Sequence, residues 1–170
     1  MWGKRLMDDE RAWQSIYQNY RRGVIDYRQT YLMLYAAYDR WCKLATGAPT
    51  MSEALEKAST LQLQVWRYFF NDDTSSMVLH MRKLFILNSV TPLSVGSVPV
   101  VLNDAYDWRG LMRLWYAARC LIVHGQGECG MIEAMLPSVH ATLSLFMARI
   151  LKAQAEDGNN RNSEQIERPN

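Results

Sequence analysis

The sequence predicts an all-α fold, a bundle of about five to six helices, from three observations. Apolar residues recur at intervals of three and four along most of the 170-residue chain. Hydrophobic residues make up 49% and charged residues 21%, which is ordinary for a chain that buries a core. The proline-bearing stretch 91–103 is too irregular to build a sheet. We expect a single helical domain at 1–155 and a disordered polar tail at 156–170.

Apolar stripes predict the first two helices. The first spans residues 8–22, carries acidic side chains in its opening turn, and ends at Gly23. The second spans 27–45 and presents an aromatic-rich apolar face for five turns. Gly47 and Pro49 then end it, since glycine favours the position after a helix and proline cannot continue one.

Capping residues mark the two helices in the middle of the chain. Thr50 and Glu53 fit a capping box, so a third helix is expected from there to about Phe70. Apolar residues at helical spacing predict a fourth helix over 77–88, which ends before Pro92.

Two longer helices are expected in the second half of the chain. The segment 91–103 forms an insertion before them, as a loop or a short extended piece. A fifth helix is predicted over 104–123, and a sixth over 130–155 with a kink or a restart at Pro137.

Composition excludes several classes of protein. The net charge of +2 gives no general attraction to polyanions, so any nucleic-acid site must be local. The three cysteines include no C-x-x-C pair, which argues against a disulfide framework and a cysteine zinc site and favours a reducing compartment. Acids at 8–10 occupy the place of a signal peptide's apolar stretch. A cytoplasmic protein without a cofactor is expected.

Membrane and metal sites are also disfavoured. The longest uncharged stretch, 84–103, reaches membrane length, but two prolines and a glycine interrupt it. His80 and His140 have no companion at metal-ligand spacing, so no metal site is predicted. Neither a phosphate-binding glycine loop nor a serine-hydrolase motif occurs in the sequence.

Arg119 is an anomaly on the fifth predicted helix. On a helical wheel it lies within about 20° of Trp108 and Met112, on the apolar stripe. Because arginine keeps its charge, it needs an anionic partner there or an interface that forms a polar cleft. One explanation is a core ion pair with Asp39 or Glu133, and the other is a phosphate site at a subunit interface.

His124 follows Arg119 by five positions and directly precedes Gly125. On an ideal helix the two side chains point about 140° apart, but a histidine in the last turn can leave the ideal register. The helix dipole favours the cationic form of a histidine at this end, which suits a proton donor. A capping or core histidine is the alternative interpretation.

This segment resembles the R-x4-6-H motif of HEPN domains, in particular the plasmid-borne, phage-borne and abortive-infection-like branches. Arg119 and His124 have four residues between them, Tyr116 precedes the arginine, and Cys120 and Gly125 occupy supporting positions of the motif. The helical plan, the aromatic second helix and the proline-bearing insertion extend the resemblance over roughly residues 10–153.

The resemblance implies a metal-independent endoribonuclease that acts as a homodimer without a cofactor. Arg119 and His124 would be its catalytic residues, the histidine moving protons and the arginine holding the scissile phosphate. Arg113 and Tyr116 are candidate RNA contacts. Such a protein would be a toxin or a defence effector, with a separately encoded antitoxin or other protein partner.

Two alternatives remain open from the residues. Many members of the family carry a polar residue just after the arginine, whereas Cys120 and Leu121 are less polar, which favours a non-catalytic dimeric module that binds RNA, a nucleotide or a protein. The other alternative is a purely structural bundle in which Arg119 forms a core ion pair.

Overall fold

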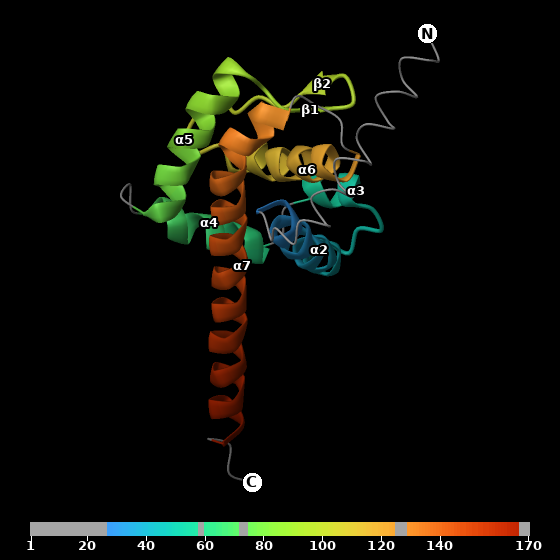
Figure 1. Cartoon of the computed structure of the whole chain (residues 1–170). Coiled ribbons are helices and arrows are strands. Elements are labelled where there is room, and N and C mark those ends of the chain that lie inside the picture. Colours follow the sequence, from blue (N-terminus) through green and yellow to red (C-terminus); the bar gives the residue numbers. More distant parts are fainter. Residues whose placement is uncertain (1–26, 58–59, 72–74, 125–128, 167–170) are drawn as a thin grey trace.

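The computed structural model describes residues 27–57, 60–71, 75–124 and 129–166 (Figure 1). These residues form six helices and one small hairpin, which confirms the predicted all-α class. The helix predicted over 8–22 lies outside the described residues. The elements are α2 (Tyr27–Thr46), α3 (Met51–Glu56), α4 (Thr60–Phe70), α5 (Ser76–Val90), β1 (Ser94–Val95), β2 (Val98–Pro99), α6 (Trp108–His124) and α7 (Cys129–Ile166).

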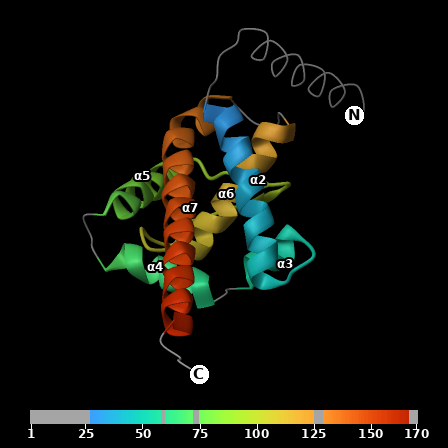
Figure 2. The same cartoon turned by 90° about the horizontal axis from the view of Figure 1, so that it is seen from below.

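Helix α7 is the central element of the bundle. It packs against α2, α4, α5 and α6, with α4 and α5 on one side and α2 and α6 on the other (Figure 2). The core lies where α2, α4, α6 and α7 meet, and it is strongly aromatic. The ring centroids of Trp66 and Phe146 are 4.9 Å apart, and those of Tyr38 and Trp115 are 5.3 Å apart. All four side chains are almost fully buried.

The predicted limits of α2 and α5 agree closely with the structure. Gly47, with a φ of +67°, follows α2 in the left-handed conformation that glycine adopts without strain. Ser75 caps α5, since its hydroxyl accepts a hydrogen bond from the amide of Val78 at 3.3 Å. Helix α5 then ends before Pro92, as predicted.

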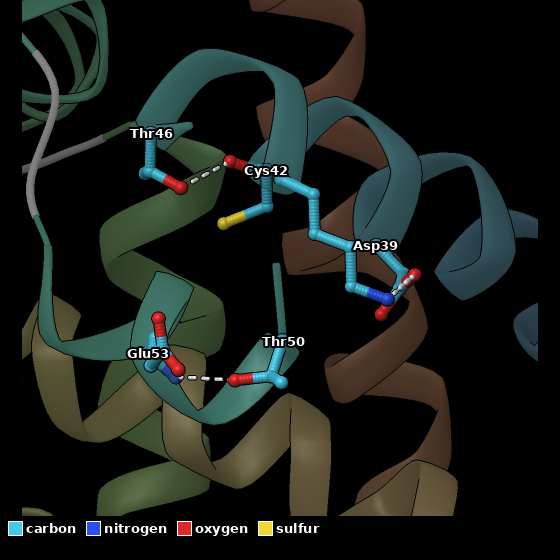
Figure 3. Close-up of polar contacts among 6 residues, drawn as sticks. Asp39, Cys42, Thr46, Thr50 and Glu53 are labelled. Atoms are coloured by element: carbon cyan, nitrogen blue, oxygen red, sulfur yellow. Dashed lines mark hydrogen bonds and ion pairs between the residues drawn. The ribbon is translucent and has the colours of Figure 1, made fainter. Parts of the chain in front are cut away.

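The third predicted helix is divided into two, so its expected course to Phe70 is wrong. Thr50 does cap α3, its hydroxyl accepting from the amide of Glu53 at 3.3 Å (Figure 3). However, Lys57 has an extended backbone and ends α3 after six residues. Helix α3 packs on α2 and α6 whereas α4 packs on α5 and α7, and one straight helix cannot reach both sets of partners.

The segment before α6 contains a small sheet, contrary to the expectation that none forms there. Strands β1 and β2 pair antiparallel, with Val95 opposite Val98. Gly96 supplies the positive φ of +61° that the tight turn requires. The amide of Val100 donates to the carbonyl of Leu93 at 2.7 Å and closes the hairpin's base.

Helix α7 is longer and less interrupted than predicted. It does not restart at Pro137, which lies inside the helix. It also continues to Ile166, into the segment 156–170 for which a polar tail is expected; residues 167–170 lie outside the described part. Arg149 pairs with Glu156 across two turns at 3.6 Å. The anchored helix can thus propagate into a polar sequence, because extending a helix is easier than nucleating one. Its C-terminal part extends beyond the other helices (Figure 1).

One described segment, 132–156 of α7, is long and apolar enough to cross a membrane by length and composition. Of its most apolar window, 44% is buried inside the bundle, where its side chains form the core. The central helix of a soluble bundle meets the same criteria, so the segment is weak evidence for a membrane protein.

Candidate functional site on helix α6

Asp107 fixes the beginning of α6, the helix that carries the candidate residues. Its Oδ1 accepts a hydrogen bond from the amide of Gly110 at 2.8 Å. Its Oδ2 accepts from the amide and the side chain of Asn103 at 3.0 and 2.8 Å. A carboxylate at this position satisfies free amides of the first turn and interacts favourably with the helix dipole. The start of α6 is therefore tied to the preceding loop.

The middle of α6 is anchored in the core by Trp115. Its indole Nε1 donates to the hydroxyl of Thr142 on α7 at 3.0 Å. Its carbonyl oxygen accepts from the hydroxyl of Tyr31 on α2 at 2.7 Å. The predicted apolar stripe is confirmed, since Leu111, Met112 and Trp115 are buried. These contacts hold the helix immediately before Arg119.

Arg119 is half-buried at the rim of this stripe, and the core ion pair considered from the sequence is not formed. Asp39 instead binds Lys43 at 2.8 Å (Figure 3), and Glu133 binds Arg28. Within the described residues, no carboxylate lies within 4.0 Å of the Arg119 guanidinium. Its Nη1 lies 4.0 Å from the thiol Sγ of Cys120. The guanidinium therefore retains donors for an external anion.

Tyr116 and Cys120 lie beside Arg119. Hydrogen bonding to the Cys120 thiol, the charge of that thiol and burial raise the pKa of Tyr116, while the Arg119 guanidinium opposes this rise. Tyr116 is half-buried, and because its pKa is raised, its hydroxyl stays neutral at neutral pH. The structure thus brings together three residues of the motif: Tyr116, Arg119 and Cys120.

Helix α2 contributes a side chain that the sequence interpretation missed. Tyr35 is 3% exposed, and its hydroxyl has no hydrogen-bond partner within the described residues. Burial is the main cause that raises the pKa of Tyr35, and the nearby charges of Asp39 and Cys120 raise it further. The spacing of the aromatic residues predicts that this face of α2 is buried, but it does not indicate that the opposing helix is α6.

His124 is exposed and is the last residue of α6. Because the helix continues through it, it remains on the helical wheel about 140° from Arg119. The described contacts include none between these two side chains, so the structure of one chain does not bring them together. Gly125 lies outside the described residues.

His124 instead shares the outward face of α6 with Arg113, from which it is about 20° away on the helical wheel. Arg109 and Arg113 are exposed on this face, and Tyr116 is half-buried beside them. The whole of α6 carries three arginines and one histidine and no acidic residue. This face is therefore a local basic surface on a chain with little net charge.

The site is an open surface within the described residues. Neither of the two best-defined cavities includes Arg119, Tyr116 or His124. One, of about 220 Å³, lies at the start of α2 and is lined by Tyr27, Arg28, Glu133, Leu136 and Pro137. The other, of about 130 Å³, lies between α4 and α7.

The other two histidines are placed apart from this site. His80 lies 3.2 Å from the hydroxyl of Ser138, and burial and the charge of Lys83 lower its pKa. His140 packs against the ring of Tyr27, and burial lowers its pKa too. The described part of the chain holds no group of three histidine, cysteine or acidic side chains that could bind a metal ion.

Comparisons with known proteins find no relative. No family model matches the chain, and no curated protein or solved structure is significantly similar to it.

Proposed function

We propose that this protein is a metal-independent endoribonuclease of the HEPN type, in which two copies of the chain place Arg119 and His124 at one cleft. The observation that carries the proposal is the half-buried Arg119 guanidinium, which has no carboxylate within 4.0 Å among the described residues. A guanidinium in this setting is suited to a phosphate group, which it binds through paired N–H donors.

The basic outward face of α6, which carries His124, supports RNA as the ligand. Arg109 and Arg113 are exposed along α6, and that helix carries no acidic residue. Their charges attract the phosphate backbone, and Tyr116 offers an aromatic ring and a neutral hydroxyl at the same surface. Arg113 and Tyr116 remain the candidate RNA contacts.

The proposed reaction is cleavage by the 2′-hydroxyl of the substrate. His124 removes the proton of that hydroxyl, whose oxygen attacks the phosphorus atom, and His124 of the second copy protonates the departing 5′-oxygen. Arg119 stabilises the charge that grows on the phosphate oxygens. The products are a 2′,3′-cyclic phosphate and a 5′-hydroxyl, and no metal ion takes part.

A second copy of the chain would bring an arginine and a histidine together, although Arg119 and His124 of one helix point apart. A two-fold axis beside the end of α6 would set the histidine of one copy against the arginine of the other. The end of α6 offers an apolar surface for such pairing: Leu121 and Ile122 are half-buried, and Val123 is 41% exposed. A role as a toxin or defence effector, controlled by a separate protein, fits such an activity.

The proposal is tested by incubating total RNA in EDTA with wild type, Arg119→Ala and His124→Ala. Arg67→Ala, which removes an exposed arginine from α4, is the matched control. Each protein is first checked for folding and association. We expect 2′,3′-cyclic phosphate ends from wild type and the control and none from the two site variants. Intact RNA with a folded, dimeric wild type, or cleavage by both site variants, would contradict the proposal.

A non-catalytic RNA-binding dimer of the same fold is the second candidate. It is favoured by the opposite directions of Arg119 and His124 on α6 and by the low polarity of Cys120 and Leu121. This candidate predicts RNA binding without turnover, and only a modest loss of affinity in His124→Ala. The same preparations, assayed for binding as well as cleavage, discriminate between the two functions.

A further inference from the structure

The outward face of α2 carries an apolar stripe that stays exposed. Met33 and Leu44 are 77% and 67% exposed, although the opposite face of α2 is buried in the core. Ala36 and Ala37 are exposed between them. On the helical wheel Met33, Ala37 and Leu44 lie within about 40° of one another, so they form one continuous stripe. A row of exposed apolar side chains on one face of a helix is typical of a surface that another element covers.

Arg40 lies on the same stripe, within about 40° of Met33 and Leu44 on the helical wheel. Its side chain is exposed, and within the described residues no carboxylate lies within 4.0 Å of its guanidinium. The preceding Asp39 binds Lys43 instead. The stripe therefore fits an apolar helical face that carries one acidic side chain opposite Arg40.

The segment before α2 is joined to it by a short linker. The sequence of that segment predicts an amphipathic helix over 8–22, which lies outside the described residues, and the four residues 23–26 separate this range from α2. Helices joined by so short a loop are usually antiparallel neighbours.

The length of the linker also favours α2 over the other exposed apolar stripe, which is formed by Leu79, Ile86 and Val90 on α5. Helix α5 lies across α7 from α2 (Figure 2), about 16–20 Å away at ordinary distances between packed helices. Four extended residues span at most about 14 Å. The stripe on α2 is therefore the one that the segment can cover.

The predicted helix presents complementary groups. Trp13, Ile16, Tyr17 and Tyr20 form its apolar face. Asp9 belongs to the same face, since it lies within about 40° of Trp13 on the helical wheel. A carboxylate on an apolar stripe needs a cationic partner, just as the arginine on the stripe of α2 needs an anionic one. One contact between the two stripes would satisfy both charges.

The register of an antiparallel pair follows from the short linker. Residue 22 then lies beside residue 27, and each position of the first helix faces the position of α2 for which the two residue numbers add up to 49. In this register an aliphatic side chain meets an aliphatic one, an indole meets a small residue, and the carboxylate meets the guanidinium. The pairs are Ile16 with Met33, Trp13 with Ala36, and Asp9 with Arg40.

We propose that the segment 8–22 packs antiparallel on the outward face of α2 in the same chain. The contact removes the exposed aliphatic side chains of α2 and the aromatic side chains of the segment from water, which favours association. A helix of this length is marginal in water by itself, so the contact with α2 supplies most of its stability.

A second copy of the chain is a poorer occupant of the stripe. If α2 of a second copy packed there, its Arg40 would approach the first one, and neither guanidinium would gain a carboxylate. The linker also holds the segment at a high effective concentration beside its own α2. The inference is independent of the nuclease proposal, because it rests on α2 and the segment before it.

Hydrogen exchange of the full chain, followed by mass spectrometry of its peptides, tests the proposal. We expect the amides of 8–22 to exchange at least about tenfold more slowly than those of an isolated peptide of the same sequence. Met33→Asp, which puts a charge into the stripe, should abolish this protection. Leu79→Asp, which puts the same charge on an exposed leucine of α5, is the matched control and should preserve it. Slow exchange in α6 and α7 shows for each variant that the bundle remains folded.

An exchange of charges tests the register. Arg40→Asp and Asp9→Arg should each weaken the protection of 8–22, and the two changes together should restore it. The proposal is overturned by a wild type without this protection, by protection that survives Met33→Asp, or by a double variant no better protected than the single ones. Protection that disappears on dilution would assign the contact to a second copy and would overturn it as well.

Discussion

The hydroxyl of Tyr31 on α2 donates a hydrogen bond to the carbonyl oxygen of Trp115 on α6, at 2.7 Å. In an α-helix that carbonyl also accepts the amide of the residue four positions later, which is Arg119. A buried side chain of one helix is thereby joined to the turn of another that carries the candidate arginine.

Tyr31→Phe tests this connection between α2 and α6. The variant loses one buried hydrogen bond but keeps the ring, and the Trp115 carbonyl keeps its helical partner. We therefore expect the free energy of unfolding to fall by about 1 kcal/mol. Urea denaturation measures it, with Tyr27→Phe, an exposed tyrosine of the same helix, as control. A loss no larger than that of the control would show that the bond adds nothing to stability.

Arg119→Met tests whether the arginine is structural. If Arg119 neutralised a buried carboxylate, its removal would cost about 3–5 kcal/mol. Since Asp39 and Glu133 are paired with other cations, we expect a loss of less than about 1 kcal/mol, as for a solvent-screened charge. Thermal or urea unfolding decides between the values, and a loss in the larger range would restore the structural interpretation.

Gly110→Ala should weaken the beginning of α6. A β-carbon at this position would lie 2.5 Å from Oδ2 of Asp107 and 2.9 Å from a methyl carbon of Leu102. The Asp107 carboxylate would have to leave the amides that it caps, and overpacking adds to this loss, so we expect about 1–3 kcal/mol of destabilisation. In an Asp107→Ala background, Gly110→Ala should lower the free energy of unfolding by less, as urea denaturation can measure. Equal losses in both backgrounds would contradict a clash with the Asp107 carboxylate.

Alkaline pH should destabilise the bundle. Burial raises the pKa of Tyr31, Tyr35 and Tyr38, so the folded state keeps protons that the unfolded chain loses above its tyrosine pKa of about 10. The contribution of these raised pKa values to the free energy of unfolding is fully present below that pH. It falls as pH rises, by about 1.4 kcal/mol per pH unit for each tyrosine.

Urea unfolding between pH 9 and 11 checks this expectation. The triple change of these tyrosines to phenylalanine should flatten the dependence on pH. An unchanged slope in that variant would assign the alkaline loss to other groups.

The sequence predicts the fold well where local signals agree with packing. Local features predict the spacing of apolar residues in α2, α5 and α6, the cap at Thr50 and the end of α5 before Pro92. The structure contains all of these features. The break after Glu56 depends on which helices α3 and α4 pack against. The helical course of 156–166 depends on the anchored helix before it. Neither of these two features can be predicted from a short stretch of the sequence.

The candidate site was predictable only in part. Arg119 could be identified because a charge on an apolar stripe conflicts with burial. The cations that pair with Asp39 and Glu133 could not be identified from the sequence. Arg28 lies far from Glu133 in sequence, and tertiary contacts decide which cation binds a given carboxylate. The basic face that joins Arg113 to His124 follows from the length of α6, which the structure extends to His124.

A mixing experiment tests the composite site most directly. Wild-type protein is held at a fixed concentration in EDTA while folded His124→Ala protein is added in increasing excess, and the rate of RNA cleavage is measured. If each cleft needs a histidine from both copies, mixed dimers are impaired, and we expect a steep fall in the rate per wild-type chain. Arg67→Ala protein, added in the same way, should not lower that rate. A rate that stays constant as His124→Ala is added, after subunit exchange is shown, would contradict a shared two-copy site.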